Sequence, residues 1–102
     1  MLDTMTLPAR DREHERVLGI VFDISPSQSA VLSCLTRAKL VTGRELRDYT
    51  EIQSQIKVAV SRTRAKLIAH GMNINSKPEV GYWIDAEDQK TIERMVQRFL
   101  EA

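Results

Sequence analysis

The sequence has few of the residues on which enzymatic and metal chemistry most often depend. Its 102 residues include one cysteine, two histidines and four glycines. The single Cys34 cannot form an internal disulfide, and His14 and His70 have no cysteine or carboxylate at metal-ligand spacing. The chain also has no nucleophile motif, no glycine-rich phosphate loop and no paired carboxylates on a rigid scaffold. We therefore expect no enzymatic activity, no catalytic residues, no cofactor, no metal site, two surface histidines and a buried cysteine.

Long apolar runs are missing as well. No stretch approaches the roughly 20 apolar residues that cross a bilayer, and residues 1–15 contain no apolar core of a secretory signal. We therefore expect a cytoplasmic protein with no membrane partner. Apolar residues still make up 42% of the 102 residues, which is enough for one globular domain with a modest core.

Acidic residues are missing from the block between Glu51 and Glu79, although the chain as a whole has a net charge of only +1. A globally basic nucleic-acid binder is therefore excluded. The block has five cations and no anion, whereas the segment from Asp85 onward has five acids and three bases. This distribution indicates one charged face on an otherwise neutral protein. The five cations are Lys57, Arg62, Arg64, Lys66 and Lys77.

Capping signals place three helices in the middle of the chain. Ser25 and Gln28 form a capping box for the first helix, and "TGRE" at 42–45 forms one for the second. A third helix is predicted over about 54–69. Gly71 then supplies the usual helix stop.

The flanking segments have other patterns. "MNINS" at 72–76 and "VGYWID" at 80–85 are typical of two short strands joined by a turn. Asp85 is expected to cap a final amphipathic helix. The pattern of residues 11–22 favours a short helix over a segment that leads into a strand. The residues before them are expected to be irregular.

This order of elements predicts an α+β, mainly α, fold of the winged helix-turn-helix kind, with an extra C-terminal helix. We divide the chain into an N-terminal segment (1–23), partly helical or loose, a winged helix-turn-helix domain (24–84) and a C-terminal amphipathic helix (85–102). The recognition helix would cover about 54–69, and the wing about 73–84.

The third helix has two contrasting faces at 100° per residue. Its buried stripe is expected to be Ile56, Val60, Thr63 and Leu67. Small residues lie in the middle of the opposite face, and long cations border them. Such a helix fits a major groove about 12 Å wide. A solvated charged face is the ordinary alternative, but a surface helix normally includes acidic residues and this one has none. The outward residues are Ser54, Val58, Ser61 and Ala65, with Lys57, Arg62 and Arg64 at the borders.

These segments resemble a known family. "IKVAVSRTRAKL" at 56–67 resembles the recognition helix of the OmpR/PhoB-type response-regulator DNA-binding domain, and "VGYWI" at 80–84 resembles the end of its wing. "ISPSQSAVLSCLTRAKLVTGRELRDYT" at 24–50 is similar to its first two helices. The resemblance spans 24–84.

The resemblance implies particular roles. Lys57 and Arg62 would contact bases, and Val58 would lie near a thymine methyl. Phosphate contacts would come from the helix and from the wing near Ser76 and Lys77, while Tyr82 would pack the wing on the helices. The predicted DNA-binding residues are Ser54, Gln55, Lys57, Val58, Ser61, Arg62, Arg64 and Lys77.

The chain also departs from the family pattern. Lys57 stands where aspartate is frequent, and Ala59 where a phosphate-contacting histidine is frequent. Pro78 and Glu79 replace the usual basic residue and glycine at the wing tip. Residues 1–23 show no sign of the family's N-terminal antiparallel sheet, and we expect a stand-alone regulator without a phospho-acceptor domain.

The C-terminal helix has an apolar stripe with two interpretations. It covers the domain, or it pairs with a second chain in a homodimer, which would let two half-site contacts add through effective concentration. The stripe consists of Ile92, Met95, Val96, Phe99 and Leu100.

Three functions remain open at this point. The first is a sequence-specific regulator of transcription that binds double-stranded DNA, with RNA polymerase or another regulator as a further partner. The second is an architectural DNA binder of the excisionase type. The third is a protein-interaction module that uses the same scaffold without binding DNA, since fold does not determine function.

Overall fold

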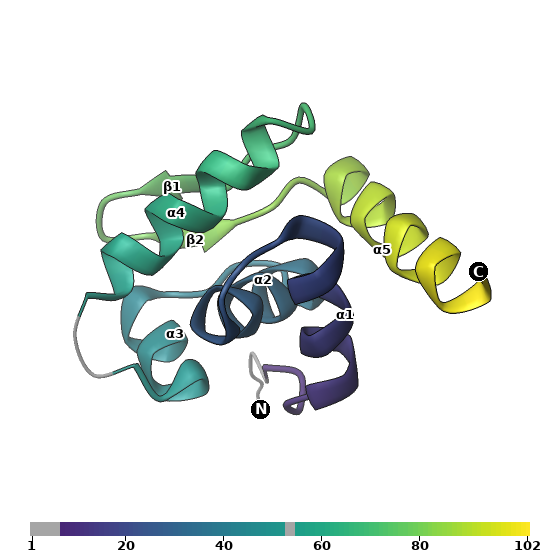
Figure 1. Cartoon of the computed structure of the whole chain (residues 1–102). Helices are drawn as coiled ribbons and strands as arrows, with labels where there is room; N and C mark the ends of the chain where they lie inside the picture. Colours follow the sequence, from purple (N-terminus) through teal and green to yellow (C-terminus); the bar gives the residue numbers. More distant parts are fainter. Residues whose placement is uncertain (1–6, 53–54) are drawn as a thin grey trace, which may run out of the picture.

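A computed structural model describes residues 7–52 and 55–102 of the chain. Within them it has five helices and one antiparallel pair of strands, so the predicted α+β, mainly helical class is confirmed. Figure 1 shows α4 in front of the β1–β2 hairpin at the top, with α5 extending to the right. The elements are α1 (Arg12–Phe22), α2 (Pro26–Arg37), α3 (Gly43–Thr50), α4 (Ile56–Ile68), β1 (Asn75–Lys77), β2 (Gly81–Trp83) and α5 (Ala86–Glu101).

Both predicted capping boxes form. Ser25 Oγ accepts from the Gln28 N–H at 3.2 Å, and Gln28 Oε1 accepts from the Ser25 N–H at 3.1 Å. Thr42 and Glu45 make the same reciprocal pair at 3.1 and 2.9 Å. Each box satisfies two backbone groups that would otherwise lack partners, so α2 and α3 have defined starting points.

The segment 11–22 contains a helix, as favoured from the sequence, and it covers Arg12–Phe22. Asp11 Oδ1 accepts from the His14 N–H at 3.0 Å and caps α1. Helices α1 and α2 meet at 110°. They approach closely at Gly19, where an added Cβ would lie 2.9 Å from Ser29 Oγ. A small residue at this position therefore lets the two helices pack.

The core is a single cluster to which every helix contributes. The stripe predicted on the third helix is buried. Burial of this apolar area supplies the main driving force for folding. The largest fully buried side chains include Leu18, Leu32, Leu35, Leu46, Val60, Leu67, Ile74 and Ile92.

The hairpin is shorter than predicted from the sequence. β1 and β2 pair over three residues each, and the flanking Met72 and Ile74 lie in the core without strand pairing. Val41 extends the pairing on the other side of β2. Its N–H donates to Tyr82 O at 2.9 Å, and its carbonyl accepts from the Tyr82 N–H at 2.8 Å. The hairpin is thereby attached to the segment between α2 and α3.

α5 packs across the C-terminal end of α2. The Gln89 side-chain amide donates to Leu35 O at 2.9 Å and to Ala38 O at 2.7 Å. These carbonyls lie at the end of α2, where no helical N–H follows. The cap predicted at Asp85 is only positional, because its carboxylate makes no capping hydrogen bond and instead accepts from Asn75 Nδ2 at 3.3 Å.

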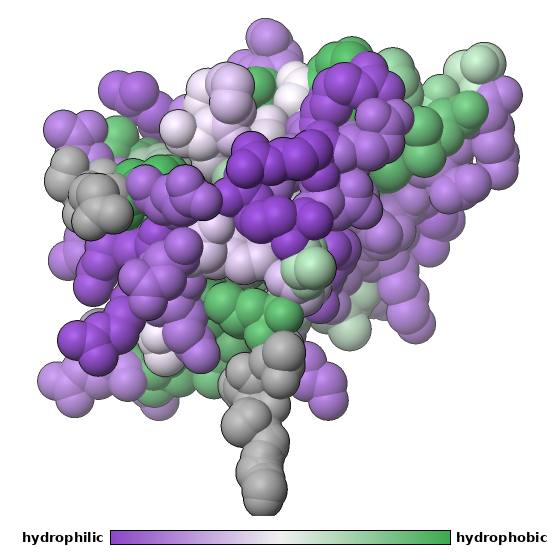
Figure 2. All heavy atoms as spheres, turned by 90° about the horizontal axis from the view of Figure 1, so that it is seen from below, coloured by the Kyte–Doolittle hydropathy of each residue, from purple (hydrophilic) through white to green (hydrophobic). Residues whose placement is uncertain are grey.

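The apolar stripe of α5 is divided. Ile92 and Val96 are buried in the core and Met95 packs partly against it, so this part of the stripe covers the domain. Phe99 and Leu100 in the last turns are 37% and 50% exposed. Figure 2, which views the molecule from below, shows apolar side chains at the upper right, on the side of α5, and further apolar patches at the lower centre and the left among hydrophilic side chains.

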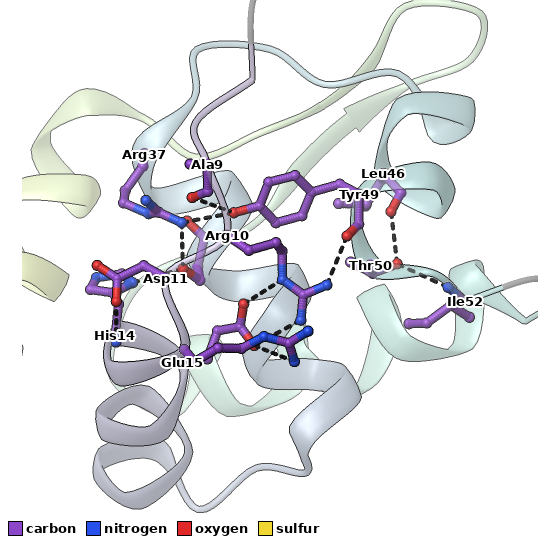
Figure 3. A network of polar contacts seen from close by, with 12 residues as sticks. Ala9, Arg10, Asp11, His14, Glu15, Arg37, Leu46, Tyr49, Thr50 and Ile52 are labelled. Atoms are coloured by element: carbon purple, nitrogen blue, oxygen red, sulfur yellow. Dashed lines mark hydrogen bonds and ion pairs between the residues drawn. The ribbon is translucent and has the colours of Figure 1, made fainter.

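A polar network fastens residues 9–15 to α2 and α3 (Figure 3). Arg10 forms a bidentate pair with the buried Glu15 at 2.7 and 3.0 Å, and its Nη1 donates to Tyr49 O at 2.9 Å. The Tyr49 hydroxyl donates to Ala9 O at 3.2 Å and accepts from Arg37 Nη2 at 2.7 Å. Burial raises the pKa of Tyr49, and the hydrogen bond to Glu15 raises the pKa of Arg10. The network ties the start of α1 to the end of α3.

No single helix in the described ranges is long and apolar enough to cross a membrane. α1 and α2 taken together meet that length and composition, but they are bent by 110°.

Candidate nucleic-acid interface

α4 begins two residues later than predicted. Gln55 has a left-handed backbone with φ of 63° and precedes the first helical residue without a side-chain cap. The Val58 and Ala59 N–H groups donate to its carbonyl. Ser54, a predicted site residue, lies outside the described residues.

The C-terminal end of α4 agrees with the prediction. Gly71 has φ of 79°, a left-handed conformation that glycine adopts without steric cost. The Met72 N–H donates to Leu67 O, and the Gly71 N–H donates to Ile68 O, both at 2.9 Å. This is a Schellman motif, so the helix ends where the chain turns toward the hairpin.

The outward face of α4 is exposed as predicted. Val58 is 41% exposed and lies among small and cationic side chains. Lys57 and Arg62, with Lys77 on β1, form no ion pair with any acid in the part of the chain that the structure describes. Lys66, in contrast, lies 3.7 Å from Asp23. The exposed predicted residues are Gln55, Lys57, Val58, Ser61, Arg62 and Lys77.

A groove of about 610 Å³ separates α4 from the hairpin. Lys57 and Arg64 line it from the helix, and Lys77 lines it from β1. Thr42 and Gly43, at the start of α3, also line it. The groove therefore brings together three of the five cations of the acid-free block, which are up to 20 positions apart in the sequence.

Arg64 is more enclosed than the other predicted cations. Its Nε donates to Ile74 O at 2.8 Å, and its Nη2 donates to Ser76 Oγ at 3.3 Å. The guanidinium thus spans from the middle of α4 to the first strand of the hairpin. Spacing along a helix does not reveal such a contact, because the two partners lie 10 and 12 residues further along the chain.

A smaller groove of about 190 Å³ borders the other side of α4. Gln55, Val58 and Arg62 line it from α4, and the N-terminal turn of α2 lines it at Ser25 and Gln28. No pattern in the sequence indicates that the start of α2 borders this face.

Arg47 is a further cation near the large groove that the sequence analysis missed. A Cβ built on Gly43 would lie 3.8 Å from Arg47 Nη1 and 3.9 Å from Tyr82 Cε2. The guanidinium therefore lies beside Gly43, which lines the groove. The i, i+4 spacing from Gly43 on a short helix is the signal that places it there.

The turn of the hairpin carries an acid, Glu79, the one carboxylate among the described residues that line the large groove. Val80 N–H donates to Lys77 O at 3.0 Å across Pro78 and Glu79. Glu79 has a φ of 64° and lines the groove together with Lys57. The tip of the hairpin is therefore less basic than its stem.

The histidine prediction is wrong for His14. Its side chain is buried, with Nδ1 2.8 Å from Ser33 Oγ and Nε2 2.7 Å from Glu93 Oε1. His14 lies on the same helical face as Val17 and Leu18, and this spacing was the signal for burial. His70 is exposed, as expected, and its ring makes a T-shaped contact with that of Phe22, with 5.1 Å between the centroids.

Cys34 is buried, as predicted, and burial raises its pKa to about 12. Across residues 7–52 and 55–102, no three histidine, cysteine, aspartate or glutamate side chains lie together as a metal site.

Comparison of the chain with protein-family models, with curated proteins and with solved structures finds no match.

Proposed function

We propose that this protein is a winged helix-turn-helix regulator that binds double-stranded DNA in a sequence-specific manner. In this proposal α4 is the recognition helix and enters the major groove, and the β1–β2 hairpin is the wing. The succession of α2, α3, α4 and hairpin supports the assignment, as does the attachment of the hairpin to Val41 between α2 and α3.

The observation that carries the proposal is the exposed face of α4 with its two flanking grooves. Small residues occupy its middle, so a base edge can approach closely. Lys57 and Arg62 stand at its borders without acidic partners among the described residues. Lysine and arginine donate to guanine O6 and N7 and to phosphate oxygens. Val58, 41% exposed between them, offers methyl groups to thymine.

Selection from a randomised duplex pool at two salt concentrations tests this proposal. A regulator enriches a sequence motif, and its affinity falls with salt by a log–log slope of about −0.9 for each phosphate that it neutralises. Retention without enrichment would replace the proposal with architectural DNA binding. Failure to retain DNA at low salt would overturn DNA binding altogether and favour a protein-interaction module.

Arg62→Ala tests the assignment of the face. If Arg62 reads a base, the variant loses roughly 1–3 kcal/mol of binding free energy and tolerates more sequences at one position. Arg98→Ala is the matched control, because it also removes an exposed arginine, but from α5. Equal losses from the two variants would mean that only net charge matters and that α4 is not the reading element.

A further inference from the structure

We infer that Arg64 acts as a strut that sets the position of the hairpin relative to α4, rather than as a phosphate ligand. This inference deepens the proposed function and rests on it. Arg64 differs from its neighbours on α4 in where its donors point. Lys57 and Arg62 are exposed, whereas the Arg64 guanidinium reaches across to two groups of the hairpin.

The hairpin needs such support because it is small. Three residue pairs join β1 and β2, and an isolated hairpin of this size is marginally stable in water. Val41 holds β2 through two backbone hydrogen bonds. Arg64 links the other strand to α4, through the hydroxyl of Ser76 in β1 and the carbonyl of Ile74 just before it. The two attachments lie on opposite strands, so together they restrict rotation of the hairpin.

The carbonyl to which Arg64 donates belongs to a residue that is held in the core. The Ile74 side chain is 1% exposed and lies in the core. A planar guanidinium that donates from two nitrogens also fixes its own orientation, which a lysine ammonium does not. The strut therefore joins a buried point of the chain to α4.

The consequence concerns Lys77, three residues after Ile74 and across the groove from Lys57. If DNA lies along α4, Lys77 reaches a phosphate only while the hairpin keeps its distance from the helix. Arg64 then acts through Lys77, as a positioning residue. Its loss should abolish the contribution of Lys77 while leaving that of Arg62 in place.

A double-mutant cycle on a selected duplex measures this coupling. One phosphate contact contributes a log–log slope of about −0.9, so at 0.1 M salt it strengthens binding about eightfold relative to the 1 M reference. We therefore expect Lys77→Ala to weaken binding about eightfold in the wild-type background and less than twofold in the Arg64→Ala background. If Lys77→Ala weakened binding equally in both backgrounds, the positioning role of Arg64 would be refuted, and Arg64 would instead be an independent phosphate contact.

Arg64→Lys separates geometry from charge. It keeps the cation but loses the two-point contact, so we expect it to resemble Arg64→Ala. Wild-type affinity in Arg64→Lys would overturn the inference. Lys66→Ala is the matched control on the same helix, because its ammonium faces Asp23 rather than the hairpin, and it should leave the effect of Lys77→Ala unchanged.

Amide hydrogen exchange gives a readout that needs no DNA. Arg64→Ala should accelerate exchange in residues 75–83 while α1, α2 and α5 keep their protection. Unchanged exchange in the hairpin would overturn the strut even if the protein binds DNA. If wild-type protein did not bind DNA, the proposed function would fail together with the DNA role of Arg64, whereas accelerated exchange would still show the mechanical contact.

Discussion

The tip of the hairpin offers one position at which backbone strain and charge can be separated by substitution. Glu79 has a φ of 64°, and a hydrogen bond of 3.0 Å from the Val80 N–H to Lys77 O closes the turn. Pro78 fixes φ near −65° at the second position. This is a type II turn, whose third position favours glycine.

The left-handed backbone at Glu79 should lower the free energy of unfolding. A left-handed conformation costs an L-residue roughly 1–2 kcal/mol, and the extra freedom of glycine in the unfolded chain offsets about 0.4–1 kcal/mol of any gain. Glu79→Gly should therefore raise the free energy of unfolding by about 0.5–1 kcal/mol. Urea denaturation followed by the fluorescence of Trp83, the single tryptophan, measures this change directly beside the hairpin.

The same substitution removes a carboxylate from a groove that is lined by Lys57 and Lys77. If phosphates approach this groove, repulsion decreases and duplex binding should strengthen by about two- to threefold at low salt. Glu79→Gln is the matched control, since it removes the charge and keeps a side chain on the left-handed backbone. It should improve binding by the same factor without any gain in stability.

Two results would refute this reasoning. If Glu79→Gly were no more stable than Glu79→Gln, the turn would not be strained. If Glu79→Gln weakened binding, the carboxylate would be making a favourable contact, such as accepting from a cytosine amino group, and its description as a repulsive element would be wrong.

Three further predictions concern stability and reactivity. Gly81→Ala should lower the free energy of unfolding by about 2–3 kcal/mol in the same urea assay, because its Cβ would lie 2.5 Å from a backbone oxygen at φ of 138°; Gly71→Ala, with nothing within 4 Å, should cost only about 1 kcal/mol. Burial raises the pKa of Cys34 to about 12, so the thiol should resist a disulfide reagent at pH 8 until guanidinium chloride unfolds the chain; fast labelling of the native protein would contradict this. The contribution of Cys34 to stability should be lost as pH rises from 9.0 toward 12. Gln89→Ala should cost about 1–3 kcal/mol and expose α5 to limited proteolysis, whereas the exposed Gln97→Ala should do neither.

Local signals in the sequence were sufficient where one residue decides the geometry. Ser25 and Thr42 specify helix starts because their hydroxyls accept from a backbone group three residues later. Gly71 specifies a helix end because the left-handed conformation suits it. The inward and outward faces of α4 follow from its period, and that is why the exposed candidate residues could be named before the fold was known.

Contacts between distant segments could not be predicted in this way. His14 was expected at the surface because no partner lies at metal-ligand spacing from it in the sequence, yet its ring nitrogens contact Ser33 and Glu93 from two other helices, 19 and 79 residues away. Arg64 has the same property, since its partners on the hairpin depend on how the chain returns after Gly71. A polar residue on an apolar helical face signals burial, but it does not name the partner.

The arrangement of the helices explains how the terminal segments contribute to the candidate interface without touching it. α4 presses its buried stripe against α2, and α2 is in turn packed by α1, α3 and α5. The hydrogen bond from Arg37 to the Tyr49 hydroxyl and the Gln89 amide fasten α3 and α5 to α2. Changes there should alter stability. If the protein binds DNA as proposed, they should leave the salt dependence of binding intact, because the exposed cations of α4 do not move. Changes at Lys57 or Arg62 should do the reverse. The two classes of variant therefore separate the scaffold from the surface that it presents.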